Sequence, residues 1–161
     1  MIGIQDIQRA MGRIRGAIRI SPCTHSEAFS TLTKSEIFLK LDNQQRTGAF
    51  KERGALNKLL TLTAEERAQG VIAASAGNHA QGVAYHAGRH GIRALIYMPL
   101  PTPLTKVSAT RAYGAEVVLH GTNYDEAYEK AIEQSQQYHL TLIHAFDDDA
   151  VIAGQDRKSV V

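Results

Sequence analysis

The sequence predicts an α/β fold, a three-layer open parallel sheet with helices on both faces. Two observations carry this prediction. Apolar strand-like segments alternate with helix-like segments from residue 71 to residue 146, and 43% of the 161 residues are hydrophobic, enough for one ordinary core. Strands that alternate with helices are joined by right-handed crossovers, which make the strands parallel and cover both faces of the sheet.

The first seventy residues predict three helices and one strand. Residues 4–14 have a helical apolar face formed by Ile4, Ile7, Met11 and Ile14. The segment "EIFLKLD" from Glu36 alternates like a strand, with its apolar residues 37, 39 and 41 on one side. Residues 51–60 predict a helix, and a short helix follows at Thr63, which forms a capping box with Glu66.

The remaining segments alternate without interruption. Four segments predict strands: "VIAAS" from Val71, "ALIYMP" from Ala94, "EVVLHG" from Glu116 and "LTLIHAF" from Leu140. Three helices separate them: one ends at Gly91, one ends at Gly114, and one is capped by Asn123. This rhythm is typical of a parallel sheet.

Composition narrows the classes of function. The formal net charge is only +2 and the basic residues are spread along the chain, so a nucleic-acid partner is not expected. The single Cys23 excludes an internal disulfide framework and a CxxC zinc motif, and it fits a reducing cytoplasm. The amphipathic N-terminal segment indicates neither a signal peptide nor a membrane span.

The segment "QQRTGAFKERGA", residues 44–55, is the first candidate site. Thr47, Gly48 and Ala49 leave room beside the backbone, and Phe50 supplies an apolar wall. Lys51 lies in the first helical turn, where the helix dipole and desolvation both favour a neutral amine. Such an amine is a nucleophile for aldehydes. From the lysine alone, an ordinary surface lysine remains the alternative.

The segment "ASAGNHAQG", residues 74–82, is the second candidate. Ser75, Ala76, Gly77 and Asn78 lie between a strand end and a helix start, where free amides favour a carboxylate or a phosphate. Tight packing of small residues remains the alternative.

Other polar residues are interpreted as surface groups. Glu52 and Arg53 are expected on a solvated helix face. His86 and His90 have helical spacing but lack a metalloprotease glutamate and a third ligand, so they are expected at the surface. Residues 147–149, "DDD", are expected to form a solvated turn, and the phosphate-binding spacing GxxxxGK[ST] is absent.

Four ordered motifs carry a family resemblance. "KLDNQQRTGAFKERGA", "ASAGNHAQGVAYHA", "EVVLHGTNYDEA" and "VIAGQ" resemble the N-terminal half of fold-type II pyridoxal-phosphate enzymes, the group of threonine and serine dehydratases that includes serine racemase. The resemblance runs from about residue 4 to Gln155. It implies the tryptophan synthase β-like version of the α/β fold, truncated, and pyridoxal 5'-phosphate as cofactor.

The resemblance also implies roles for individual residues. Lys51 would be the catalytic residue that forms the Schiff base with the cofactor, Phe50 would pack beside the pyridine ring, and Asn78 would bind the 3-hydroxyl oxygen. The substrate carboxylate would be received by Ser75, Gly77, Asn78 and His79, largely through backbone amides. Ala49 stands where much of the family has serine, which puts one hydrogen bond to the cofactor phosphate in doubt.

The implied reaction is β-elimination of a hydroxy amino acid. The freed Lys51 amine would take the α-proton, and the hydroxyl would leave, giving a 2-oxo acid and ammonia from threonine or serine. Ala76 stands where the racemase branch usually has a second serine, and alanine cannot transfer a proton. The sequence therefore favours a threonine or serine ammonia-lyase. A serine racemase-like enzyme and a non-catalytic fragment are the alternatives.

The resemblance also predicts how the chain divides. Residues 1–54 would begin a large cofactor domain, residues 55–145 would form a small α/β domain, and residues 146–155 would return to the large domain. The tail "DRKSVV", residues 156–161, is interpreted as an assembly artefact, because the resemblance stops at Gln155 and codons for the tail match a sequencing-adapter stretch. A full-length cytoplasmic homo-oligomer is expected, with no membrane partner.

Overall fold

A four-stranded parallel sheet forms the centre of the molecule. The computed structural model describes residues 2–155, so the predicted artefactual tail lies outside the described residues. The strand order is β5-β4-β3-β6, and each neighbouring pair is parallel. The strands are β3 (Val71–Ala74), β4 (Ala94–Met98), β5 (Glu116–Leu119) and β6 (Thr141–Leu142).

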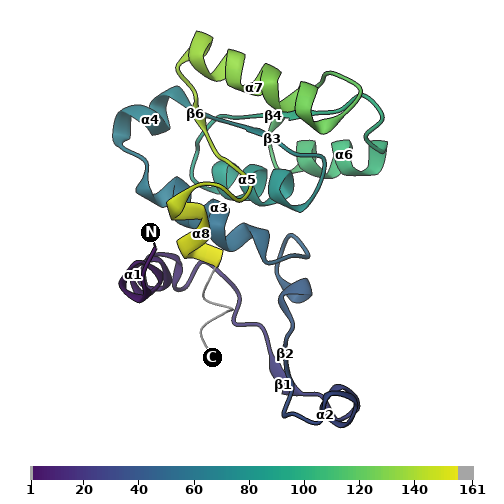
Figure 1. Ribbon diagram of the computed structural model, residues 1–161. Helices are drawn as coiled ribbons and strands as arrows, with labels where there is room; N and C mark the ends of the chain where they lie inside the picture. Colours follow the sequence, from purple (N-terminus) through teal and green to yellow (C-terminus); the bar gives the residue numbers. More distant parts are fainter. Residues whose placement is uncertain (1, 156–161) are drawn as a thin grey trace.

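Helices cover both faces of this sheet (Figure 1). One face carries α5 (Asn78–Arg89) and α6 (Leu104–Ala112), and the other carries α7 (Tyr124–Tyr138). Because strand side chains alternate, Ala73 belongs to the apolar cluster with Val83 of α5, whereas Ile72 belongs to the cluster with Ala131 of α7. The predicted three-layer α/β fold is confirmed.

Within the described part of the chain, four further helices belong to the body of the molecule. They are α1 (Ile4–Ile14), α3 (Lys51–Thr61), α4 (Ala64–Gln69) and α8 (Asp149–Gln155). Helix α3 packs against both α5 and α8. At Gly82 of α5, an added Cβ would lie 3.1 Å from the Glu52 Cα, so glycine permits the close approach of α5 to the start of α3. The predicted capping box of Thr63 and Glu66 is present at α4.

A short antiparallel arm projects from the body (Figure 1). It consists of β1 (Cys23–His25), α2 (Glu27–Thr33) and β2 (Phe38–Lys40), and a short 3-10 helix, η1 (Asp42–Gln44), follows. The strand predicted from Glu36 is therefore present but short. All three residues of β2 are exposed, and β2 pairs only with β1 among the described strands.

The helix predicted over residues 4–14 is present, and the strand predicted from Leu140 is shorter than expected. In α1 the buried residues are Ile7, Ala10 and Ile14, whereas Ile4 and Met11 are exposed, because α1 packs on α3 and α8 along a narrower stripe. The predicted seven-residue strand from Leu140 pairs with β3 only at Thr141 and Leu142. The Ile143 amide still donates to the Ile72 carbonyl, and the residues after Ile143 leave the sheet and form part of the candidate site.

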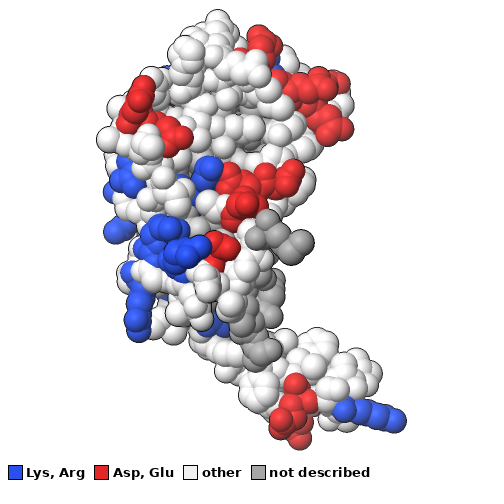
Figure 2. Space-filling model, turned by 60° about the vertical axis from the view of Figure 1, so that its left-hand side comes forward, with Lys and Arg blue, Asp and Glu red and all other residues white. Residues whose placement is uncertain are grey.

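The surface carries charges of both signs. Figure 2 shows basic side chains gathered over the middle of one face, with acidic side chains beside and above them. Within residues 2–155, no helix combines the length and the apolar character needed to cross a membrane.

The expectation of a surface position was wrong for His86, although His90 is exposed. His86 is 1% exposed within α5, and no described group lies within hydrogen-bond distance of its Nε2. Burial, with smaller contributions from the nearby charges of His90, Arg46 and Arg89, lowers the pKa of His86 to about 3. The sequence gives no sign of this burial, because histidine is compatible with either environment.

His86 should make the fold sensitive to acid. A histidine of ordinary pKa in the unfolded chain binds a proton near pH 6.5, but the folded chain binds it only near pH 3, so stability falls as pH decreases between these values. Between pH 7 and pH 4.5, we expect the free energy of unfolding to fall by roughly 2 kcal/mol less in His86→Leu than in the wild type. Urea unfolding at both pH values measures this difference. An unchanged pH dependence would contradict the prediction.

Candidate active site

The candidate site lies where the strand order reverses. From β3 the chain adds β4 and then β5 on one side, and α7 returns it to β6 on the other side of β3. In open parallel sheets, ligands bind outside the carboxyl ends of the strands at such a reversal. Ser75 directly follows β3, and Ile143 directly follows β6.

Lys51 is half-buried at the first residue of α3. Its Nζ donates a hydrogen bond to the Ala145 carbonyl at 2.8 Å and lies 5.5 Å from the centre of the Phe50 ring. Burial lowers the pKa of the Lys51 amine, the direction expected from the sequence. A larger fraction of this amine is therefore neutral, and hence nucleophilic, than for an exposed lysine at the same pH.

The turn before Lys51 is fixed by Glu52. Gly48 has φ +72°, a left-handed conformation that suits glycine. The Glu52 carboxylate accepts hydrogen bonds from the Thr47 amide at 2.8 Å and from the Thr47 hydroxyl at 2.7 Å. These contacts close the turn that presents Phe50 and Lys51.

The prediction that Glu52 and Arg53 are solvated was therefore wrong. Glu52 is fully buried and Arg53 is 3% exposed. Arg53 forms a two-pronged ion pair with Asp42, at 2.7 Å through Nε and 3.0 Å through Nη2. Burial opposes ionisation of Asp42, but hydrogen bonds from Arg53 and Ser21 outweigh it and hold the pKa of this carboxyl well below its usual range.

The turn between β3 and α5 contains the other predicted site residues. The Ser75 amide donates to the Tyr97 carbonyl at 3.0 Å, and the Gly77 amide donates to the Ser75 hydroxyl at 3.2 Å. No side chain caps α5, so the first amides of this helix are available to an anion. An added Cβ at Gly77 would meet nothing within 4 Å, and Asn78 is exposed, so this turn is open.

His79 is placed differently from its neighbours. Its ring is 3% exposed, and its Nε2 lies 2.9 Å from the Ile143 carbonyl. Burial lowers the pKa of His79 to about 4, and the nearby positive charge of Lys51 also lowers it. The ring is thus neutral near pH 7 and donates from Nε2, so only the backbone amide of His79 is available to a ligand.

The arrangement fits pyridoxal phosphate. Lys51 offers an amine of lowered pKa for the aldehyde, and Phe50 offers a ring face beside it. A hollow of about 550 Å³ borders Gly48, Ala49 and Phe50, but it is lined mainly by residues 38–43 and not by Lys51 or the turn before α5. The open turn from Ser75 to Asn78 offers amides for an acidic group.

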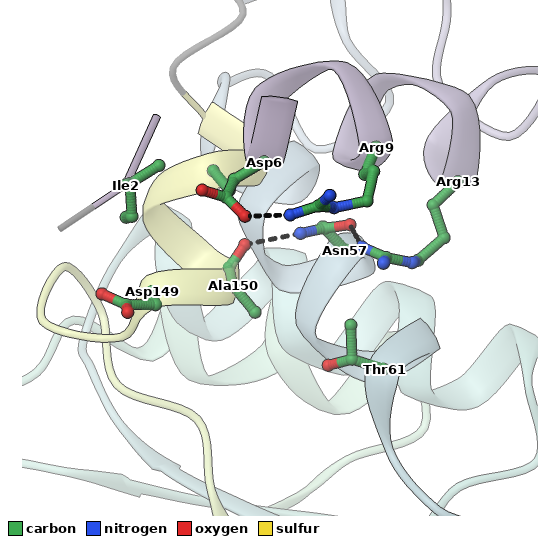
Figure 3. Close-up of a pocket in the computed structure, with 9 residues that line it drawn as sticks. Ile2, Asp6, Arg9, Arg13, Asn57, Thr61, Asp149 and Ala150 are labelled. Carbon is green, nitrogen blue, oxygen red and sulfur yellow. Dashed lines mark hydrogen bonds and ion pairs between the residues drawn. The ribbon is translucent and has the colours of Figure 1, made fainter. Parts of the chain in front are cut away.

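A second hollow, of about 340 Å³, lies between α1, α3 and α8, away from Lys51 (Figure 3). Its polar groups are bound to one another: Arg9 pairs with Asp6 at 2.6 Å, Arg13 donates to Asn57 at 2.7 Å, and Asn57 donates to the Ala150 carbonyl at 2.7 Å. These contacts attach α1 and α8 to α3.

The expected solvated turn at residues 147–149 is only partly correct. Asp147 and Asp149 are exposed. Asp148 accepts from the amides of Ala150 and Val151 at the start of α8 and pairs with Lys58 at 2.6 Å. This residue therefore attaches α8 to α3.

Sequence reasoning missed the two backbone acceptors of the site. The Ile143 and Ala145 carbonyls bind His79 and Lys51, respectively. Every residue has a carbonyl group, so no residue type marks these positions. The available signal was their place after the strand that adjoins β3.

Comparisons with known proteins identify relatives of this chain. The family model described as "Pyridoxal-phosphate dependent enzyme" matches residues 14–158. An L-threonine ammonia-lyase of Thermotoga maritima is 46% identical over 96% of this chain, and one of Geobacter sulfurreducens is 50% identical over 92%. A serine racemase structure from Dictyostelium discoideum superimposes on 99% of this chain with a TM-score of 0.91 at 32% identity.

The matches cover only part of each relative. This chain spans 39% and 37% of the two ammonia-lyases and 52% of the racemase. The shared part contains both candidate segments.

Proposed function

Because the chain belongs to the family of pyridoxal-phosphate-dependent enzymes, we propose that it contributes the catalytic lysine and the substrate-binding turn of a threonine or serine ammonia-lyase. The single observation that carries this proposal is the position of Lys51. Its half-buried amine donates to the Ala145 carbonyl in the loop after β6, and its charge lowers the pKa of His79 in the first turn of α5. The relatives named as L-threonine ammonia-lyases support the reaction class.

In this proposal, Phe50, Lys51 and Asn78 would hold the cofactor, and the substrate amine would release Lys51 from the cofactor aldehyde, so that the Lys51 amine is free to act as a base. The substrate carboxylate is bound at the start of α5 by the Ser75 hydroxyl and by the amides of Gly77, Asn78 and His79, whereas the Ser75 amide stays on the Tyr97 carbonyl. The bound cofactor supplies an electron sink for the negative charge that develops at the substrate Cα.

The residues of this chain perform the proton transfer. The Lys51 Nζ takes the α-proton, because its lowered pKa leaves more of the amine in the basic form. The buried His79 stays neutral and supports the turn through the Ile143 carbonyl. Loss of the substrate hydroxyl then leads to a 2-oxo acid and ammonia.

Racemisation is the second candidate, favoured by the fold similarity to serine racemase. Ala76 argues against it. This residue lies in the open turn between Ser75 and Gly77, and its methyl group cannot deliver a proton to the substrate. Elimination needs only the one base that Lys51 provides.

A serine at position 76 should therefore raise racemisation. The protein for this test is a chimaera in which residues 1–155 precede the matching remainder of a threonine ammonia-lyase relative. We expect the unmodified chimaera to form 2-oxo acid much faster than D-amino acid. Ala76→Ser should raise the rate of D-serine formation on the order of tenfold or more, because it adds a second acid-base group. Chiral chromatography of products from L-serine measures both rates.

Ala76→Gly is the matched control, because it changes the turn without adding a hydroxyl. If the unmodified chimaera forms mainly D-serine, the ammonia-lyase proposal is wrong. If Ala76→Gly raises D-serine as much as Ala76→Ser does, the added hydroxyl is not the cause.

The remaining expectations about the whole protein stay proposals. They are the boundaries at residues 54 and 145, a hydroxy amino acid as substrate, a homo-oligomer, and a cytoplasmic location without nucleic-acid or membrane partners. The boundary at residue 54 falls inside α3, which is continuous from Lys51 to Thr61.

A further inference from the structure

The loop after β6 binds two residues of the candidate site through its backbone. The Ile143 carbonyl accepts from His79 Nε2 at 2.9 Å, and the Ala145 carbonyl accepts from Lys51 Nζ at 2.8 Å. His79 comes from α5 and Lys51 from α3, so one loop joins the two helices at the site. A carbonyl moves only with its backbone, so the conformation of this loop decides where both acceptors lie.

His144 holds that conformation. Its Nδ1 accepts from the Phe146 amide at 3.2 Å and from the Asp147 amide at 2.7 Å, which closes a tight turn around Ala145. Its ring also packs edge-on against the Tyr128 ring of α7, with 5.4 Å between the ring centres, and against the Phe146 ring, with 4.6 Å between the ring centres. The ring is thus fixed between α7 and the loop.

The two hydrogen bonds to His144 Nδ1 require the imidazole form in which Nδ1 carries no proton. A ring nitrogen accepts only when it carries no proton, so neutral His144 has its proton on Nε2. The aromatic contacts do not depend on this choice. The acceptor function and the packing function of His144 can therefore be separated by substitution.

We propose that His144 is a positioning residue for Lys51: by accepting from the amides of residues 146 and 147, it holds the Ala145 carbonyl against the Lys51 amine. This proposal rests on the proposed function only in treating Lys51 as the lysine that reacts. Without the turn, the loop leaves the amine, and water reaches it more freely.

Two substitutions distinguish the acceptor from the ring. His144→Phe keeps an aromatic ring between Tyr128 and Phe146 but has no acceptor. His144→Asn loses the ring but keeps an oxygen at the same position along the side chain as Nδ1, and asparagine commonly accepts from an amide two residues further on. The proposal expects failure of the phenylalanine variant and rescue by asparagine.

Reactivity of Lys51 provides a readout that needs no cofactor. The chain is treated with trinitrobenzenesulfonate at several pH values, and peptide mass spectrometry follows modification of Lys51, with exposed Lys106 as internal standard. Burial lowers the pKa of the Lys51 amine. In His144→Phe, water reaches this amine, so its pKa rises and the pH midpoint of its labelling rises with it. We expect its labelling rate at pH 8, relative to Lys106, to fall at least about threefold, because a larger fraction of the amine is then protonated. His144→Asn should stay within about twofold of the wild type.

The proposal is contradicted if Lys51 is labelled in His144→Phe at the wild-type rate, or if the labelling rate falls equally in both variants. A direct check on the wild type uses the ¹⁵N chemical shifts of His144: an unprotonated Nδ1 supports the proposal, and a protonated Nδ1 overturns it even if a variant fails to fold. Failure of the proposed function is distinguishable. In that case pyridoxal phosphate does not react selectively with Lys51 in the wild type, whereas labelling still depends on His144.

Discussion

Replacing Lys51 with alanine is expected to abolish formation of 2-oxo acid from threonine and serine by the chimaera. The reason is chemical: alanine has no amine to bind the cofactor aldehyde or to take the α-proton. The visible absorption of the bound cofactor should disappear with the activity. A coupled assay for 2-oxo acid and an absorption spectrum measure the two effects.

Lys106→Ala is the control for this experiment. Lys106 is an exposed lysine of α6, so its loss removes one amine without touching the site. Activity and spectrum should stay close to those of the unmodified chimaera. If Lys51→Ala retains both, the assignment of Lys51 is wrong.

Replacing Asp42 with alanine is expected to cause the largest loss of stability. Arg53 is 3% exposed and forms two hydrogen bonds to Asp42, so Asp42→Ala leaves a buried guanidinium without its counter-charge. Removing one partner of a buried ion pair costs about 3–5 kcal/mol, a large share of the roughly 5–15 kcal/mol that stabilises a typical domain. The free energy of unfolding in urea measures this loss.

The exposed pair of Arg93 and Glu116 supplies the control. Its two side chains are 56% and 59% exposed, so Glu116→Ala should cost less than about 1 kcal/mol. If Asp42→Ala costs no more than Glu116→Ala, the buried pair does not hold the start of α3. The comparison matters for function because Arg53 lies only two residues after Lys51.

The elements with strong local signals could be predicted from the sequence. The structure contains the predicted apolar strands β3 and β4 and the predicted start of α3 at Lys51. It also contains the capping box at Thr63 and the cap at Asn123. In each case neighbouring residues determine the conformation, through apolar pattern or hydrogen bonds to free amides.

The features that depend on distant partners could not be predicted. Glu52 and Arg53 look like solvated charges in sequence, and only the fold shows that Thr47 and Asp42 bind them in the interior. His86 is buried for the same kind of reason. The strand predicted from Leu140 included Ala145, because the apolar residues around it fit a strand pattern, but pairing with β3 ends at Leu142 although β3 continues to Ala74.

The central claim is that this chain carries the cofactor-binding lysine at Lys51. The most direct test is to incubate the chain with a small excess of pyridoxal phosphate, reduce it with borohydride, and locate the attached cofactor by peptide mass spectrometry. We expect attachment predominantly at Lys51, because its amine has a lowered pKa and adjoins the Phe50 ring. Attachment spread evenly over exposed lysines, with Lys51 no more modified than Lys106, would contradict it.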